Sequence, residues 1–178
     1  AGASIGTLST TDPDAGDTAT YSITGTDKDS FELVGSTLKL KDSVSGDFET
    51  QSSYSISLTA TDTGSNTRTE AFTISVTDVN EAPTAVALSA SSFAENSSGP
   101  TIGTLSSTDP DSGESFSYAI SGTDASSFEV VGSSLRLKSS VSSDFETKSA
   151  YAITITSTDS GGNTKSNDFT ISVTDANE

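Results

Sequence analysis

Apolar residues occupy every second position in several short stretches of this chain. The pattern is present at residues 38–40, 54–60, 72–76, 151–155 and 169–173, where Ser, Thr or a charged residue separates the apolar side chains. A period of two places the apolar side chains on one face of an extended strand. Helical spacing is not sustained anywhere. With Gly- and Asp-rich turns between the stretches, the pattern predicts about seven short strands in each full copy of a repeated domain, the number typical of a β-sandwich.

The chain repeats itself at an offset of 97 residues. Without any gap, 50 of 81 overlapping positions are identical, and the shared segments include Asp12-Pro13-Asp14 with Asp109-Pro110-Asp111. A period of this length indicates two copies of one domain. We therefore expect two tandem all-β sandwiches, repeat 1 at residues 1–81 and repeat 2 at residues 82–178.

The two copies differ at their start. Repeat 2 begins with residues 82–97 (APTAVALSASSFAENS), whose counterpart would precede Ala1. We expect repeat 1 to lack its N-terminal strand. Either the sequence is part of a longer array of repeats, or another chain supplies the strand by adding to the open sheet edge.

Aromatic residues recur at the same repeat positions. Tyr21, Phe31, Phe48, Tyr54 and Phe72 of repeat 1 each have an identical partner in repeat 2. We interpret them as core residues and not as a platform for stacking sugars.

Composition then narrows the function. The 178 residues include 25 acidic and 8 basic side chains, for a net charge of −17. Such a charge argues against nucleic acid and anionic membrane surfaces as partners, and no apolar run is long enough for membrane insertion. The chain has no Cys and no His, so thiol and imidazole catalysis and ordinary zinc sites are excluded, and we expect no enzyme.

The acidic residues gather at the predicted ends of strands. They are Asp12, Asp14, Asp47, Glu49, Asp62 and Asp78 and their partners 97 residues later. Loops of a sandwich cluster at its two ends, so the last loops of repeat 1 and the first loops of repeat 2 are expected to share one junction. Carboxylates crowded there would repel one another unless cations bind. Oxygen-only ligands of flexible geometry favour Ca²⁺ over Mg²⁺. The alternative is that these Asp residues only cap turns.

At this point the chain resembles the cadherin repeat, in the form found in large bacterial surface adhesins. The segments that carry the resemblance are AEN at 94–96, DFE at 47–49 and 144–146, DVNEAP at 78–83, DPD at 109–111 and TDSG at 158–161. They match the family's calcium-binding motifs in order. Glu81 departs from the pattern, because the family usually has Asp there.

The resemblance implies two cadherin-like Greek-key sandwiches with Ca²⁺ held between consecutive repeats. The ligands it implies at the complete junction are Asp47, Glu49, Asp78, Asn80, Glu81, Asp109, Asp111 and Asp159. Those it implies at two half-sites are Asp12, Asp14 and Asp62 before repeat 1, and Glu95, Asp144, Glu146, Asp175 and Asn177 after repeat 2.

We therefore expect a calcium-dependent module of an extracellular, cell-surface adhesin, in which Ca²⁺ rigidifies a rod of neighbouring repeats. The alternative is that the repeats themselves bind a ligand, either another copy of the protein or a polysaccharide.

Overall fold

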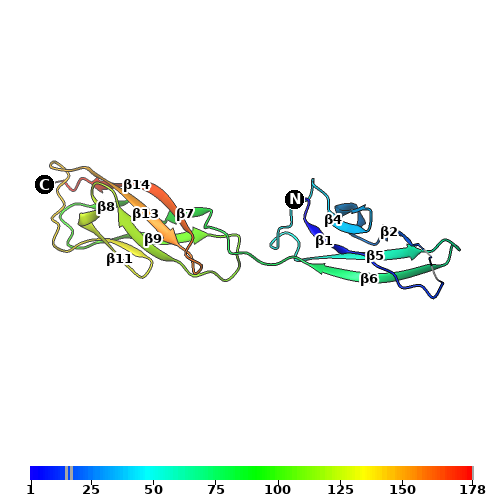
Figure 1. Ribbon diagram of the computed structural model, residues 1–178. Helices are drawn as coiled ribbons and strands as arrows, with labels where there is room; N and C mark the ends of the chain where they lie inside the picture. The colour runs from blue at the N-terminus through cyan, green and yellow to red at the C-terminus, as the bar shows by residue number, and fades with distance from the viewer. Residues whose placement is uncertain (15, 17, 178) are drawn as a thin grey trace. The chain divides into compact units, whose positions relative to one another are not determined.

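The computed structural model describes residues 1–14, 16 and 18–177, which fall into two compact units. Unit 1 is Ala1–Val79 and unit 2 is Asn80–Glu178, so the boundary lies two residues before the one expected from the sequence. Both units are built from strands (Figure 1). None of the helices in the described part of the chain has the length and apolar character needed to cross a membrane.

Unit 2 is a sandwich of two four-stranded sheets. Its elements are β7 (Ala85–Leu88), β8 (Ser92–Ala94), β9 (Thr101–Thr108), β10 (Ser117–Ser121), the short 3₁₀ helix η2 (Ala125–Ser127), β11 (Phe128–Val131), β12 (Ser134–Leu137), β13 (Ala150–Thr158) and β14 (Thr164–Thr174). One sheet has the order β10-β13-β14-β8 and the other the order β11-β12-β9-β7. β11–β12 and β13–β14 are hairpins within one sheet, and the other connections cross between the sheets, as in the expected Greek-key sandwich.

The expected first strand of unit 2 is divided between the two sheets. β7 pairs antiparallel with β9, whereas β8 pairs parallel with β14. The segment from β7 to β8 thus completes one edge of each sheet.

Unit 1 has six strands in its described residues, which correspond to β9–β14. They are β1 (Ser4–Thr7), β2 (Thr20–Thr24), β3 (Phe31–Val34), β4 (Thr37–Leu40), β5 (Ser53–Thr61) and β6 (Thr67–Ser75), with the 3₁₀ helix η1 (Lys28–Ser30) before β3. The sheets have the orders β1-β4-β3 and β2-β5-β6. No strand among the described residues of unit 1 corresponds to β7 or β8.

Alternating side chains from both sheets form one apolar core in each unit. In unit 2 the buried core residues are Val86, Phe93, Ile102, Leu105, Phe128, Leu135, Leu137, Tyr151, Ile153, Ile155, Ile171 and Val173. In unit 1 they are Phe31, Leu38, Leu40, Tyr54, Ile56 and Leu58. The unit 1 core is smaller because strands equivalent to β7 and β8 are absent from its described residues, so part of its apolar face is open.

Two of the five aromatic residues expected in the core of repeat 1 are exposed. Phe31 and Tyr54 are buried and meet edge to face, with ring centroids 5.4 Å apart. Phe48 is instead 36% exposed and Phe72 is 41% exposed. Phe72 lies on β6, whose outer edge has no neighbouring strand among the described residues. The prediction was wrong for these two residues, since burial of Phe72 requires a strand beside β6.

The turn before η2 is held by an acid with a structural role. Asp124 accepts a hydrogen bond from the backbone N–H of Ala152 (2.7 Å) and forms an ion pair with Lys148. The hydrogen bond from the Lys148 ammonium lowers the pKa of Asp124, and the N–H of Ala152 adds to this effect. The ammonium also lies 4.7 Å from the centre of the Tyr151 ring. Asp124 therefore fastens the turn to β13.

Candidate metal sites

The N-terminal pole of unit 2 contains a loop that leaves one carboxylate oxygen without a partner. After β9, the backbone N–H of Asp111 donates to Oδ1 of Asp109 (3.0 Å), which folds the Asp109-Pro110-Asp111 segment into a tight turn. Oδ2 of Asp109 is buried and accepts no hydrogen bond from the described residues. A buried, unpaired carboxylate oxygen is unfavourable unless a cation or water binds it.

The segment that leads into unit 2 is bound to this pole. The N–H of Glu81 donates to Oδ2 of Asp111 (2.8 Å), and the side-chain amide of Asn80 donates to Oδ2 of Asp159 (3.0 Å). The amide of Asn163 donates to the carbonyl oxygens of Asn80 and Glu81, both at 3.0 Å. Backbone and side-chain contacts therefore place Glu81, Asp109, Asp111 and Asp159 together. We call these four residues the N-terminal acidic cluster.

Asp159 is the most buried member of the N-terminal acidic cluster, with 7% of its surface exposed. Burial raises its pKa, but hydrogen bonds from Asn80 and from the backbone N–H groups of Asn163, Gly162 and Gly161 outweigh burial and leave the pKa below its ordinary value. The carboxylate is thus held in its charged form. Gly161 packs so closely on Asn80 that a Cβ atom at position 161 would collide with the Asn80 amide.

Unit 1 repeats part of this arrangement. The N–H of Asp14 donates to Oδ1 of Asp12 (2.9 Å), as in the corresponding turn of unit 2. Asp12 and Asp62 line one small cavity. Both oxygens of Asp62 accept hydrogen bonds from Asn66, from its backbone N–H at 2.7 Å and its side-chain amide at 2.8 Å. The amide of Asn66 thus closes back on its own loop, whereas the corresponding Asn163 binds the leading segment of unit 2.

A second group of acids lies at the C-terminal pole of unit 2. Glu95, Glu146 and Asp175 each place one carboxylate oxygen within 4.8 Å of the others, and we call them the C-terminal acidic cluster. Glu95 is only 4% exposed and accepts hydrogen bonds from the N–H groups of Phe145 (2.7 Å) and Ala176 (2.6 Å). Glu95 therefore joins the end of β8 to two other segments.

The crowding of this cluster acts on Glu146. Its own backbone N–H lowers the pKa of Glu146, but desolvation and the negative charges of Glu95, Asp175 and Asp144 together raise the pKa above its ordinary value. Neighbouring carboxylates disfavour the charged form in this way unless a cation is present.

The other residues that the sequence predicts as ligands either cap turns or are exposed outside both clusters. Both oxygens of Asp144 accept hydrogen bonds from Thr147, and Asp47 is bound in the same way by Thr50. These bonds cap turns, which was the alternative reading of the Asp residues. Glu49, Asp78 and Asn177 are exposed. Asp47, Glu49 and Asp78 belong to unit 1, so their part in a site shared with unit 2 stays a prediction.

The residues of both clusters fit a hard divalent cation. All their side-chain donors are oxygens, and carboxylates of mixed Asp and Glu type can bind through one or two oxygens, as Ca²⁺ requires. The unpaired Oδ2 of Asp109 lies in one cluster, and mutual repulsion of the acids acts in the other. Residues that could hold the ion in unit 2 are Asn80, Glu81, Asp109, Asp111 and Asp159 at one pole and Glu95, Glu146 and Asp175 at the other.

Sequence reasoning missed two residues of the N-terminal pole. Asn163 fastens the leading segment, and Glu114 accepts hydrogen bonds from the N–H (3.0 Å) and hydroxyl (2.6 Å) of Ser160. Asn163 recurs as Asn66 in the repeat, so the repeated TD-x-G-x-N segment was an available signal. Glu114 recurs only as a different acid, Asp17, in the repeat, which is a weaker signal.

Comparison with known proteins agrees with this geometry. Residues 89–174 match the model of the cadherin domain family. The matched segment covers most of unit 2. Protocadherin Fat 4 of mouse is 32% identical over 94% of the chain, and that of human is 34% identical over the same share; the chain spans only 4% of either relative. Both relatives are vertebrate proteins. The comparisons therefore support the resemblance to cadherins, but they do not support the more specific expectation of a bacterial adhesin.

Solved cadherin structures show the same fold. The structure of protocadherin gammaB7 EC3-6, a cis-dimer, is 27% identical over 98% of this chain and 44% of its own, with a TM-score of 0.71. Human protocadherin-24 EC1-2 is 21% identical over 96% of this chain and 88% of its own, with a TM-score of 0.77. The expected cadherin-like sandwich fold is confirmed.

Proposed function

We propose that the chain is a calcium-dependent module of an extracellular cell-surface adhesion protein. The observation that carries the proposal is the N-terminal acidic cluster, where the leading segment and two loops bring four acidic residues together and the buried Oδ2 of Asp109 accepts no hydrogen bond from the described residues. The match of residues 89–174 to the cadherin domain family supports the same conclusion. When bound, Ca²⁺ would neutralise these carboxylates.

In the proposed site, residues from consecutive repeats hold the ion together. Asn80, Glu81, Asp109, Asp111 and Asp159 would contribute from unit 2. Asp47, Glu49 and Asp78 would contribute from unit 1, as the motif order suggests. The remaining acids and Asn177 would belong to the sites shared with further repeats. An ion bound from both sides would restrict the hinge between repeats, which is the basis for a rigid surface rod in a bacterial adhesin.

Calcium titration tests the proposal. Isothermal titration should give saturable Ca²⁺ binding to the wild type, and the double variant Asp109→Ala with Asp111→Ala should lose the tightest site. Small-angle scattering should show a broader distribution of end-to-end distances after chelation. The matched control is Asp124→Ala, because Asp124 is an acid bound to Lys148 outside both clusters. Identical scattering curves with and without calcium would contradict the rod.

A second candidate function is self-association. The related protocadherin gammaB7 forms a cis-dimer, and a copy of this chain is the corresponding partner here. Sedimentation at increasing concentration, with and without calcium, tests it, and a single monomeric species throughout would exclude it. The polysaccharide alternative stays a prediction of the sequence and is tested by binding to a glycan array.

A further inference from the structure

The chain that leads into unit 2 is bound before β7 begins. Thr84 donates to the carbonyl oxygen of Thr108 through its backbone N–H (2.8 Å) and its hydroxyl group (3.1 Å), and Pro83 is buried. Asn80 and Glu81 precede these contacts and are exposed. Exposed residues outside a strand move freely unless other groups bind them. The contacts of Asn80 and Glu81 therefore decide where the ordered part of unit 2 begins.

The side-chain amide of Asn163 binds this leading segment at two points. Its nitrogen lies 3.0 Å from the carbonyl oxygen of Asn80 and 3.0 Å from that of Glu81. An amide NH₂ group carries two N–H donors, so each can bind one carbonyl oxygen. The backbone of Asn163 is fixed separately, because its N–H donates to Oδ1 of Asp159 (2.8 Å) and its carbonyl oxygen accepts from the N–H of Asp159 (3.1 Å). We call the two bonds from the Asn163 amide the Asn163 clamp.

The leading segment also donates hydrogen bonds to unit 2. Nδ2 of Asn80 lies 3.0 Å from Oδ2 of Asp159 and 3.0 Å from the carbonyl oxygen of Glu81. The N–H of Glu81 donates to Oδ2 of Asp111 (2.8 Å). The carbonyl oxygen of Glu81 thus accepts one hydrogen bond from each of two amides, which uses both of its lone pairs. All these bonds join protein groups, so they can form without a metal ion.

The loop that carries Asn163 is anchored as well. Oε2 of Glu114 accepts hydrogen bonds from the N–H (3.0 Å) and the hydroxyl group (2.6 Å) of Ser160. Gly161 packs against the amide of Asn80 so closely that a Cβ atom would collide with it. The amide of Asn163 therefore projects from a fixed loop, and little conformational entropy is lost when it binds the leading segment.

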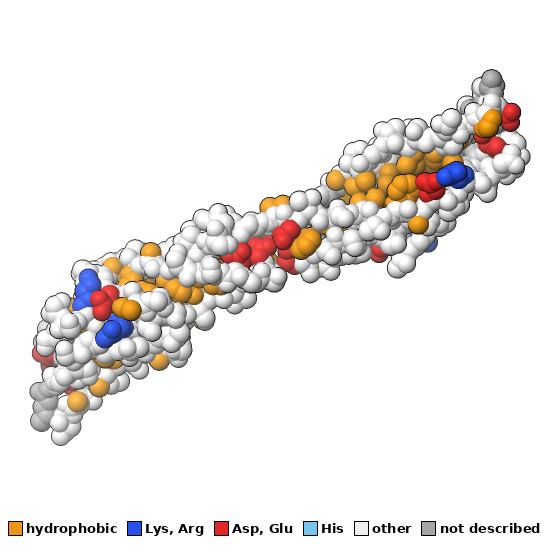
Figure 2. All heavy atoms as spheres, turned by 90° about the horizontal axis from the view of Figure 1, so that it is seen from below, with side chains coloured by type: hydrophobic (Ala, Val, Ile, Leu, Met, Phe, Trp, Pro, Cys, Tyr) orange, Lys and Arg blue, Asp and Glu red, His pale blue; other side chains and the backbone are white. Residues whose placement is uncertain are grey.

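The donors that hold the leading segment are uncharged. They are the amides of Asn80 and Asn163 and the N–H of Glu81. On the face drawn in Figure 2, acidic side chains gather near the start of unit 2 without a basic side chain beside them. Uncharged donors leave the negative charge of these acids in place. The leading segment can therefore stay attached while the carboxylates bind a cation.

The chain between the two units is exposed before Asn80. The last strand of unit 1 is followed by Val76, whose N–H donates to the carbonyl oxygen of Ser52 (2.9 Å). Residues 77–79 come next and are exposed, with 65% of the surface of Val79 accessible to solvent. A few exposed residues between two fixed ends can absorb the backbone rotation of a hinge. The position of the hinge thus depends on whether the Asn163 clamp holds.

We propose that Asn163 is a positioning residue that keeps Asn80 and Glu81 attached to unit 2 whether or not a metal ion is bound. Bending of the chain between the repeats is then confined to residues 77–79. One consequence rests on the proposed function, because it concerns calcium affinity. A leading segment that is already ordered lowers the entropy cost of binding the ion, so loss of the Asn163 clamp should weaken calcium binding.

NMR relaxation of the full chain in a calcium chelator tests the proposal. In the wild type the backbone order parameter of Glu81 should be about 0.8 or higher, and in Asn163→Ala it should fall to about 0.6 or lower. The hydrogen-exchange protection of the Glu81 amide should fall by about tenfold or more, because two hydrogen bonds are lost. Asn163→Asp keeps the side-chain size but has no N–H donor at neutral pH, so it should release Glu81 in the same way.

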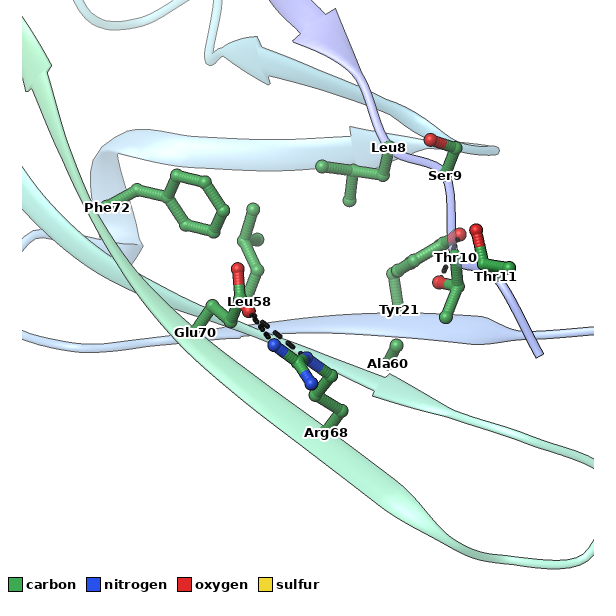
Figure 3. A pocket seen from close by; sticks show the side chains of 10 residues that line it. All are labelled: Leu8, Ser9, Thr10, Thr11, Tyr21, Leu58, Ala60, Arg68, Glu70 and Phe72. Atoms are coloured by element: carbon green, nitrogen blue, oxygen red, sulfur yellow. Dashed lines mark hydrogen bonds and ion pairs between the residues drawn. The ribbon is translucent and has the colours of Figure 1, made fainter. Parts of the chain in front are cut away.

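Two variants of unit 1 serve as controls. Asn66→Ala removes an amide that donates to Oδ2 of Asp62 (2.8 Å) within its own loop. Glu70→Gln changes the net charge by one unit, as Asn163→Asp does, and breaks the ion pair with Arg68 (Figure 3). Both controls should leave the order parameter of Glu81 at its wild-type value.

The measurements in chelator decide the proposal without reference to calcium. A Glu81 order parameter below about 0.6 in the wild type would overturn it, as would a wild-type value in both Asn163 variants. In a calcium titration, Asn163→Ala should bind about tenfold more weakly than the wild type, and equal affinities would overturn the positioning role. Absence of calcium binding by the wild type would instead contradict the proposed function, while the result in chelator would still stand.

Discussion

Replacing Glu95 should separate a structural role from a metal-binding role within one cluster. The side chain is 4% exposed and accepts hydrogen bonds from the N–H groups of Phe145 and Ala176 at 2.7 and 2.6 Å. A hydrogen bond to a charged group contributes about 1.5–3 kcal/mol. Glu95→Ala should therefore lower the free energy of unfolding of unit 2 by about 3 kcal/mol or more, even in the presence of a calcium chelator. Glu95→Gln keeps one acceptor oxygen and should lose about half of that amount.

Glu146 provides the matched control, because it is exposed in the same cluster. Glu146→Gln should not lower the stability in chelator and should raise it slightly, because it relieves the repulsion from Glu95, Asp175 and Asp144. The same change should remove most of the stabilisation that added calcium gives to this pole. Urea unfolding followed by hydrogen exchange with mass spectrometry resolves the two units, and unit 1 acts as an internal reference. If Glu95→Ala in chelator stays within about 0.5 kcal/mol of the wild type, the two backbone hydrogen bonds do not support the pole as described.

Three further predictions concern the core, the pH dependence and the leading segment. Ile171 is fully buried, so Ile171→Ala should destabilise unit 2 by about 3–5 kcal/mol in urea unfolding. Ile74 is only half-buried, so Ile74→Ala should destabilise unit 1 by less than half as much. Equal losses would refute the weaker packing of unit 1. Lys148 lowers the pKa of Asp124, so this acid stabilises unit 2 above about pH 4, and its contribution is lost as the pH falls through the lowered pKa. The melting temperature of Asp124→Asn should therefore fall less between about pH 4 and pH 2 than that of the wild type. Parallel melting curves for the two proteins would count against the ion pair. Gly161→Ala should weaken calcium binding in a titration without unfolding unit 2, since its methyl group would displace the linker amide; unchanged affinity would argue against that contact.

The repeat and the period-two pattern were sufficient to predict the fold. Identical positions in two copies indicated corresponding strands, and each of β9 to β14 has a counterpart in unit 1, although β1 and β6 are shorter than β9 and β14. Identity could not predict burial, however. Phe72 and Phe169 are the same residue at the same repeat position, yet Phe72 is 41% exposed, because its burial depends on a strand outside the aligned 81 positions.

The candidate sites were predictable to a similar extent. Motif order located the acids at strand ends, and hydrogen bonds within unit 2 bring Asp109, Asp111 and Asp159 to one pole. The sequence could not distinguish an acid with an unpaired oxygen from one that caps a turn. Asp109 and Asp144 occupy equally acidic motifs, but both oxygens of Asp144 are bound by Thr147, and only the three-dimensional positions of hydroxyl and N–H groups reveal this difference.

The attachment of Asn80 and Glu81 to the loops of unit 2 bears on how such chains are divided for expression. A fragment that starts at Ala82, where the alignment of the copies places the second repeat, would omit the amide that donates to Asp159 and the N–H that donates to Asp111. Oxygens now satisfied by those groups would then face solvent. A fragment that starts at Asn80 keeps Asn80 and Glu81 with the sandwich whose loops they bind. The folded unit therefore begins two residues before the repeat that the sequence defines.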